Sequence, residues 1–75
     1  MNPAGLHLPP IERRIFELVR QHPNLSPGEL RLRVWNDPGK RTELHLAVSR
    51  LNRLLALVKL EVRTSGGGYQ VRGVS

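Results

Sequence analysis

Apolar residues in the first third of the sequence follow the spacing of one face of an α-helix. Pro10 suits the first turn of a helix, where its missing N–H leaves no hydrogen bond unmade, and Pro23 stops the pattern. Between the two prolines, the apolar residues lie mostly three or four positions apart: Ile11, Ile15, Leu18 and Val19. This spacing predicts a helix over Pro10–Gln21.

The second periodic stretch is ambiguous until the residues before it are considered. Residues 30–34 alternate apolar and basic side chains, which taken alone is typical of a strand. The preceding residues 26–29, Ser-Pro-Gly-Glu, form a capping box, with a hydroxyl at the N-cap, proline at the first helical position and a carboxylate at the third. The box favours a helix over Pro27–Trp35, and Asn-Asp-Pro-Gly at 36–39 predicts a turn after it.

The third stretch has the longest amphipathic pattern and predicts a helix over residues 42–58, with Thr42 as its cap. At about 100° per residue, one side of this helix is apolar along its length: Leu44, Ala47, Val48, Leu51, Leu54, Leu55 and Val58. The opposite side and its flanks are mainly polar or basic: His45, Leu46, Ser49, Arg50, Asn52 and Arg53. The helix therefore has one side for a core and another for solvent or a ligand.

A change to a period of two predicts a hairpin at the end of the chain. Residues 60–64 and 69–71 alternate apolar and polar side chains, and glycines 66–68 join them. The order helix, helix, basic helix, glycine-tipped hairpin predicts an α+β fold, a winged helix-turn-helix with three helices followed by a C-terminal β-hairpin as the wing. We expect one domain over residues 10–72, a flexible N-terminal arm over 1–9 and a short tail over 73–75.

Charge is concentrated in the second half of the sequence. The whole chain of 75 residues has a net charge of +6. From position 40 onward seven Lys and Arg face two Glu, a net +5, whereas residues 1–39 carry five Arg against four acids, a net +1. This excess lies where a third helix and a wing would meet phosphates, so double-stranded DNA is the expected partner. Self-association on DNA and an additional protein partner both stay open.

Several other functions are disfavoured by what the sequence lacks. With no cysteine, the chain cannot form disulfides, thiolate metal sites or a cysteine nucleophile, and this fits a cytoplasmic, nucleoid-associated protein. No apolar run approaches the ~18 residues of a membrane span. The histidines, His7, His22 and His45, lie far apart without acids at metal-ligand spacing. We expect no metal, no cofactor and no enzymatic activity.

Several segments resemble the OmpR/PhoB family, the winged-helix effector domains of bacterial response regulators. The matching segments are Val34-Trp35 closing the second helix, Arg41-Thr42 opening the third, Val48-Ser49-Arg50-Leu51 with Arg53-Leu54 within it, and Gly66-x-Gly68-Tyr69 in the wing. The resemblance implies that the third helix enters the major groove and that the wing reaches the minor groove or backbone beside it.

The sequence also departs from that family. It contains no receiver domain, residues 1–9 leave no room for the family's N-terminal sheet, and the loop over 36–41 is several residues shorter. A minimal winged helix of this kind also resembles phage excisionases and small repressors. We therefore expect a small transcriptional regulator or an accessory architectural factor, without regulation by phosphorylation.

The expected DNA contacts come from three places. Lys40 and Arg41 precede the third helix and suit phosphates at the groove edge, where the helix dipole also favours an anion. On the helix, Ser49 and Asn52 suit base edges, and Leu46 suits a thymine methyl group. Phosphate or base contacts are expected from the helix residues His45, Arg50 and Arg53, and contacts from the hairpin are expected at Arg63, Ser65, Gly67 and Arg72.

Each of these residues also has an ordinary interpretation. Exposed arginines and polar residues are commonly just solvated, and an exposed leucine needs no ligand. We expect Trp35 to pack on the core rather than to stack on bases, and Tyr69 to pack its ring on the core with its hydroxyl outside. The rival function is a winged helix used as a protein-interaction module, which the apolar residues Leu46 and Leu57 favour.

Overall fold

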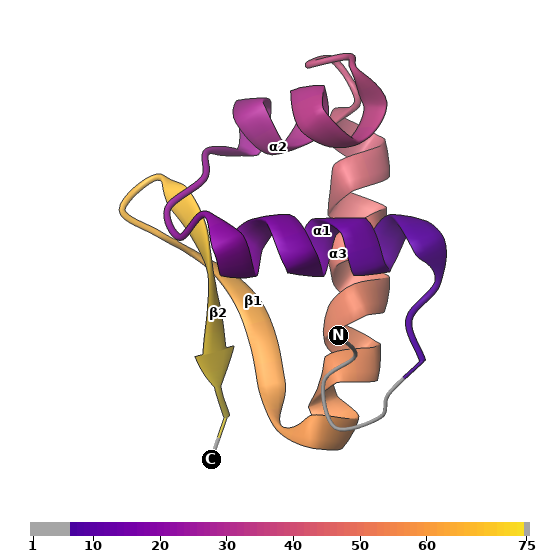
Figure 1. Ribbon diagram of the computed structural model, residues 1–75, viewed down its shortest axis with the longest axis vertical. Coiled ribbons are helices and arrows are strands. Elements are labelled where there is room, and N and C mark those ends of the chain that lie inside the picture. Colours follow the sequence, from indigo (N-terminus) through magenta and orange to yellow (C-terminus); the bar gives the residue numbers. More distant parts are fainter. Residues whose placement is uncertain (1–6, 75) are drawn as a thin grey trace.

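The computed structural model describes residues 7–74 and has the predicted order of elements (Figure 1). Its architecture is α+β, with three helices followed by a two-stranded antiparallel sheet. The elements are α1 (Pro10–Gln21), α2 (Pro27–Trp35), α3 (Arg41–Leu55), the 3₁₀ turn η2 (Ala56–Val58), β1 (Leu60–Ser65) and β2 (Gly68–Gly73). The expectations for residues 1–6 and 75 lie outside the described residues.

The first two helices begin and end where the local sequence predicts. Helix α1 starts with a proline at its first position and ends at His22, whose N–H donates to Leu18 O at 2.9 Å. In α2 the Ser26 hydroxyl accepts from the Glu29 N–H at 3.2 Å, which confirms the N-cap. This helix ends at Asn36, which adopts a left-handed conformation with φ 55°.

Helix α3 is shorter than predicted and is capped differently. It begins at Arg41, so Thr42 lies inside its first turn, and the N-cap residue Lys40 makes no side-chain capping bond. After Leu55 the chain tightens into η2, and Lys59, at φ 59°, ends it in a left-handed conformation. The predicted single helix over 42–58 is therefore corrected to an α-helix followed by a 3₁₀ turn. The apolar periodicity continues through both, which is why the sequence pattern could not separate them.

The hairpin has longer strands and a tighter turn than the sequence pattern suggests. Ser65 pairs with Gly68, so the loop between them is the two residues Gly66 and Gly67. Both have positive φ, 62° and 87°, and a two-residue turn with two positive φ values matches the twist of paired strands. Glycine is favoured at these positions because it adopts positive φ without steric cost.

A short backbone contact joins the hairpin to the loop between α1 and α2. Asn24 N donates to Tyr69 O at 3.0 Å, and Tyr69 N donates to Leu25 O at 2.9 Å, so this loop pairs with the outer edge of β2. At Gly68 a Cβ atom would collide with the backbone of Asn24. The third glycine of the run is therefore needed for close packing rather than for the turn, which the sequence analysis did not predict.

The core lies where α1, α2, α3 and β1 meet. Its members are Leu8, Ile15, Phe16, Leu18, Val19, Leu30, Leu44, Ala47, Leu51, Leu55 and Val62. The apolar face predicted for the third helix is confirmed, since four of its residues are buried and the other three pack partly against the core. Leu8 was placed in a flexible arm but is fully buried, and Arg13 Nη2 donates to its carbonyl at 3.4 Å. No helix in the described part of the chain is long and apolar enough to cross a membrane.

Candidate nucleic-acid interface

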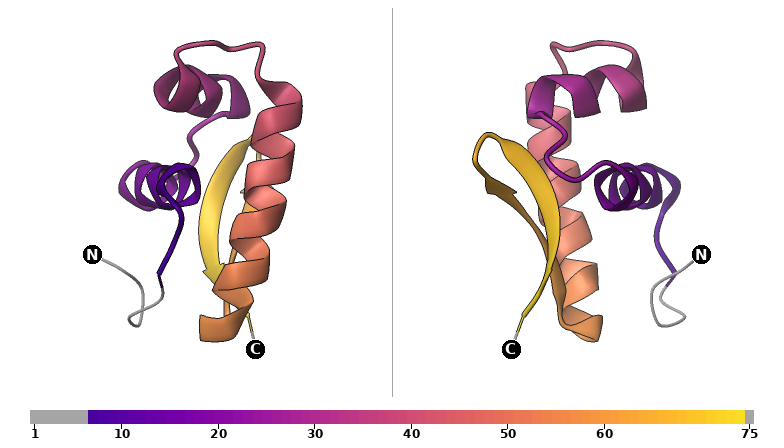
Figure 2. Two further views of the ribbon diagram at one scale, coloured as in Figure 1. Left: turned by 90° about the vertical axis from the view of Figure 1, so that its right-hand side faces the viewer. Right: turned by 60° about the vertical axis from the view of Figure 1, so that its left-hand side comes forward.

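The exposed side of α3 is the most prominent candidate surface. Helices α1 and α3 lie on opposite sides of the molecule in the left view of Figure 2, so one long side of α3 is left uncovered by α1. We call this side the outer face of α3, and its exposed residues are Thr42, His45, Leu46, Ser49 and Arg53. The sequence pattern correctly predicted that the last four are exposed opposite the apolar face.

Two side-chain contacts fix the orientation of α3 about its own axis. On one flank, Arg50 Nε donates to Glu12 Oε2 of α1 at 3.0 Å. On the other, Asn52 bonds to the backbone of β1. At about 100° per residue these two side chains point about 160° apart, with Ser49 and Arg53 between them. Both contacts therefore keep the outer face turned away from the rest of the molecule.

Asn52, expected to read base edges, makes a structural contact with β1. Its Nδ2 donates to Val62 O at 3.0 Å, and its Oδ1 accepts from Val62 N at 2.7 Å. Val62 is the register partner of Val71, and its N–H and C=O face away from β2. The amide of Asn52 completes the hydrogen bonds of this strand edge. Both polar atoms of its side chain are thus engaged with β1, so we leave Asn52 out of the proposed base contacts.

Arg50 lies at the border of the outer face and is already paired. Its side chain is 58% exposed, while that of its partner Glu12 is 5% exposed. The sequence analysis did not identify Glu12 as a partner because the two residues lie in different helices, and nothing in either helix pattern links them. Arg50 is therefore an anchor between α1 and α3 as well as a potential cation for DNA.

The turn before α3 places two cations at the start of the helix. Asp37 organises this turn, since its Oδ1 accepts from Gly39 N at 2.9 Å. Arg31 of α2 donates to the carbonyl of Pro38 and ties the turn to the preceding helix. Arg41 is exposed in the first turn of α3, and Lys40 before it is half-buried. The positive charge expected at the N-terminal end of α3 is thus held on an ordered turn.

The hairpin has one polar and one core-facing side. Val62, Tyr69 and Val71 pack on the core, and the alternate positions form the polar side: Glu61, Arg63, Ser65, Gln70 and Arg72. Of these, Glu61 lies opposite Arg72 in register and pairs with Arg63 across 3.6 Å. The acid therefore offsets part of the charge of the two arginines. Ser65 and Gly67 are exposed at the tip of the hairpin.

The two aromatic side chains expected to pack on the core both do so. Trp35 and Tyr69 are half-buried against the core residues, which confirms the expectation for both. Burial raises the pKa of Tyr69 above its ordinary value of 10.0, and the nearby Arg31 partly opposes this shift. Both rings therefore contribute to the packing of the core.

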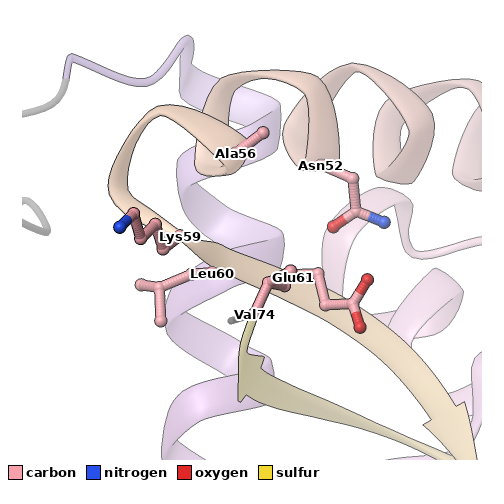
Figure 3. Close-up of a pocket in the computed structure, with 6 residues that line it drawn as sticks. All are labelled: Asn52, Ala56, Lys59, Leu60, Glu61 and Val74. Atoms are coloured by element: carbon pink, nitrogen blue, oxygen red, sulfur yellow. The ribbon is translucent and has the colours of Figure 1, made fainter.

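A hollow of about 280 Å³ lies between the end of α3 and the start of β1 (Figure 3). Its lining residues are Asn52, Ala56, Lys59, Leu60, Glu61 and Val74. In Figure 3 the Lys59 ammonium points away from the Glu61 carboxylate. Lys59 is the single cation among the lining residues, so the hollow has no group of converging cations. In residues 7–74 no cluster of three His, Asp or Glu side chains has the geometry of a metal site.

Comparisons of the chain with protein-family models, with curated proteins and with solved structures found no match.

Proposed function

We propose that the chain is a winged helix that binds double-stranded DNA with sequence preference, using α3 in the major groove and the β1–β2 hairpin as the wing. The observation that carries the proposal is the outer face of α3. It is a continuous exposed surface whose orientation two flanking contacts fix. A surface that reads bases must be preorganised in this way, because each base contact depends on the position of one side chain.

The dimensions and charge of α3 fit a major groove. Its 15 residues make a rod about 22 Å long, which can lie in a groove about 12 Å wide. Arg53 is exposed on the outer face in the last turn of α3, and its guanidinium suits a bidentate contact to guanine. Ser49 and His45 offer hydrogen bonds to base edges or phosphate, and Leu46 offers an apolar contact to a thymine methyl group.

Phosphate contacts would come from the N-terminal end of α3 and from the hairpin beside it. Lys40 and Arg41 lie at the N-terminal end of α3, where the helix dipole also favours an anion. Arg63 and Arg72 lie on the polar side of the hairpin, which runs along α3 in the views of Figure 2. Contacts of this kind position a protein on the duplex, whereas the outer face of α3 would supply sequence preference.

Selection of bound sequences from a random pool of duplex DNA tests the proposal. We expect enrichment of a defined short site, tighter binding to this site than to a scrambled duplex, and affinity that falls log-linearly with salt as phosphate counterions are displaced. A pool that shows no enrichment, together with no measurable binding to any duplex at low salt, would refute it. Such binding would suit either a regulatory or an architectural role.

A protein-interaction module is the second candidate function, because two leucines of the α3 region are exposed. Leu46 is 50% exposed on the outer face of α3, and Leu57 is 74% exposed in η2. Apolar side chains in such positions can dock on a partner protein. Binding through them should depend weakly on salt and should be lost in Leu57→Ser, whereas DNA binding should have a steep salt dependence.

A further inference from the structure

The ion pair between Glu12 and Arg50 engages a cation that lies at the edge of the proposed DNA surface. Glu12 lies in the first turn of α1 and is 4% exposed, although it carries a carboxylate. Arg50 Nε contacts its Oε2 at 3.0 Å. Figure 1 shows α1 crossing α3, which brings together two residues far apart in the sequence.

A buried carboxylate holds its counter-charge more tightly than an exposed one. An exposed ion pair contributes little, because water and salt screen both partners. A carboxylate that loses its partner while it stays buried is left uncompensated, and this is unfavourable. For Arg50 to reach a phosphate it would have to leave Glu12 or share its donors between the two anions. Glu12 therefore competes with DNA for this guanidinium.

The position of Arg50 makes this competition relevant to DNA. On the helical cylinder it lies about 60° from Arg53 and about 40° from Leu46, both of which belong to the outer face. Its side chain is 58% exposed even while paired, so part of the guanidinium is open to solvent at the border of that face. Once released from Glu12, a cation in such a place would meet the phosphate backbone at the edge of a groove.

We infer that Glu12 acts as a brake on sequence-independent DNA binding by holding Arg50 away from phosphate. This inference rests on the proposed function. The brake acts on affinity and leaves the base-reading residues unchanged, so it lowers binding to the selected site and to unrelated duplex by the same factor. Its effect is to limit the time that the protein spends on unrelated DNA.

The test is Glu12→Gln, which removes the charge but keeps an acceptor for Arg50. Release of Arg50 should add one phosphate contact, which makes the slope of log affinity against log salt more negative by about 0.9. If the contribution of this added phosphate contact vanishes near 1 M salt, the affinity of Glu12→Gln for DNA exceeds that of the wild type about 15-fold at 50 mM salt and about 4-fold at 200 mM. The gain should be equal on the selected and the scrambled duplex.

Matched variants separate release of Arg50 from a general change of charge. Glu17→Gln makes the same charge change on α1, and Glu17 has no ion pair among the described residues. It should change the slope much less. The double variant Glu12→Gln with Arg50→Gln should lose the gain, and Arg50→Gln alone should keep the wild-type slope. Melting temperatures check that each variant is folded.

Three outcomes would contradict the inference about Glu12. They are a wild-type slope in Glu12→Gln, a gain in affinity that persists in the double variant, or a slope that is less negative by about 0.9 in Arg50→Gln alone. The last would mean that Arg50 already contacts phosphate in the wild-type complex, and it decides the matter even if Glu12→Gln fails to fold. Failure of the proposed function is a different result, since the wild-type protein would then bind no duplex at all.

Discussion

Three neighbouring polar residues of α3 differ in their contacts within the protein, and these contacts decide which of them is free to bind a ligand. Arg50 faces a buried carboxylate of α1, and Asn52 bonds to the backbone of β1. Arg53 is exposed and has no ion pair among the described residues. The sequence analysis grouped all three as DNA contacts because their residue types suit that role. Under the proposed function, these contacts make Arg53 the residue of the three that is free to read a base.

Substitution of Arg53 by Ala should weaken binding to the selected site by roughly 1–3 kcal/mol more than binding to a scrambled duplex. The reason is the loss of a base contact in addition to one charge. Stability should change by no more than about 0.5 kcal/mol, because the side chain packs on nothing in the core. Competition binding with the two duplexes measures the difference.

Arg20→Ala is the matched control for Arg53→Ala. Arg20 lies near the end of α1, with its guanidinium 5.9 Å from the centre of the Phe16 ring. The substitution Arg20→Ala removes the same charge far from the outer face of α3, so it should weaken binding to the selected and the scrambled duplex slightly and by the same factor. Equal specific affinity of the Arg53 variant and wild type would remove Arg53 from the base-reading surface.

Asn52→Ala should behave in the opposite way, with a loss of stability rather than of recognition. It leaves the N–H and C=O of Val62 without their partner, and unpaired buried polar groups cost about 1–3 kcal/mol. Ser49→Ala, on the exposed outer face, should cost less than about 0.5 kcal/mol. Chemical denaturation compares the two. A variant at position 52 that unfolds like wild type but loses site preference would restore the base-reading assignment.

At the scale of elements, local signals determined α1 and α2, and distant contacts determined the rest. Each of these two helices begins with a proline and is followed closely by a breaker, and α2 also has a serine cap, so their ends could be predicted. The end of α3 depends on how the chain turns into β1, and the packing of Gly68 depends on Asn24. Such contacts join parts of the chain that no local pattern relates. The hairpin was predictable as a hairpin, but its exact register was not.

Gly68→Ala should destabilise the protein, although glycine-to-alanine changes in flexible loops are commonly harmless. The added Cβ would meet the backbone of Asn24, so either the hairpin or the α1–α2 loop must move. Overpacking of this kind typically costs about 1–3 kcal/mol. Gly66→Asn is the control, because φ 62° suits asparagine at the first position of this turn and the space there is open. Thermal unfolding that ranks the two variants in the reverse order would contradict this account of the wing.

The hairpin should contribute charge rather than site preference to DNA binding. Arg63→Ala combined with Arg72→Ala removes two cations from its polar side and should make the salt slope less negative by up to about 1.8. The ratio of specific to non-specific affinity should stay the same, since phosphate contacts carry no sequence information directly. An unchanged slope in the folded variant would mean that the hairpin has a structural role only.

At the scale of the whole molecule, one small core supports all the candidate contacts. Leu8 and Leu25 show how much of it depends on segments outside the regular elements, since the first is fully buried and the second packs against the core and bridges to β2. The sequence analysis predicted neither, because a single leucine beside prolines has no periodicity to mark it. It did predict which side of α3 faces this core, and the candidate site follows from that orientation.

Leu51→Ala should therefore test the orientation of α3 and the cooperativity of the molecule together. Leu51 is fully buried, whereas Arg53, two positions later, is exposed. A buried Leu→Ala change costs about 2–5 kcal/mol, a large share of the roughly 5 kcal/mol that a small domain possesses. The variant should have a much lower melting temperature, and its DNA binding should fall in parallel with the folded fraction, while molecules that remain folded keep wild-type site preference. Circular dichroism and DNA titration at several temperatures measure both quantities. If Leu51→Ala melted like wild type while Arg53→Ala unfolded the protein, the inner and outer faces of α3 would be exchanged, and the outer face could not be the DNA-reading surface.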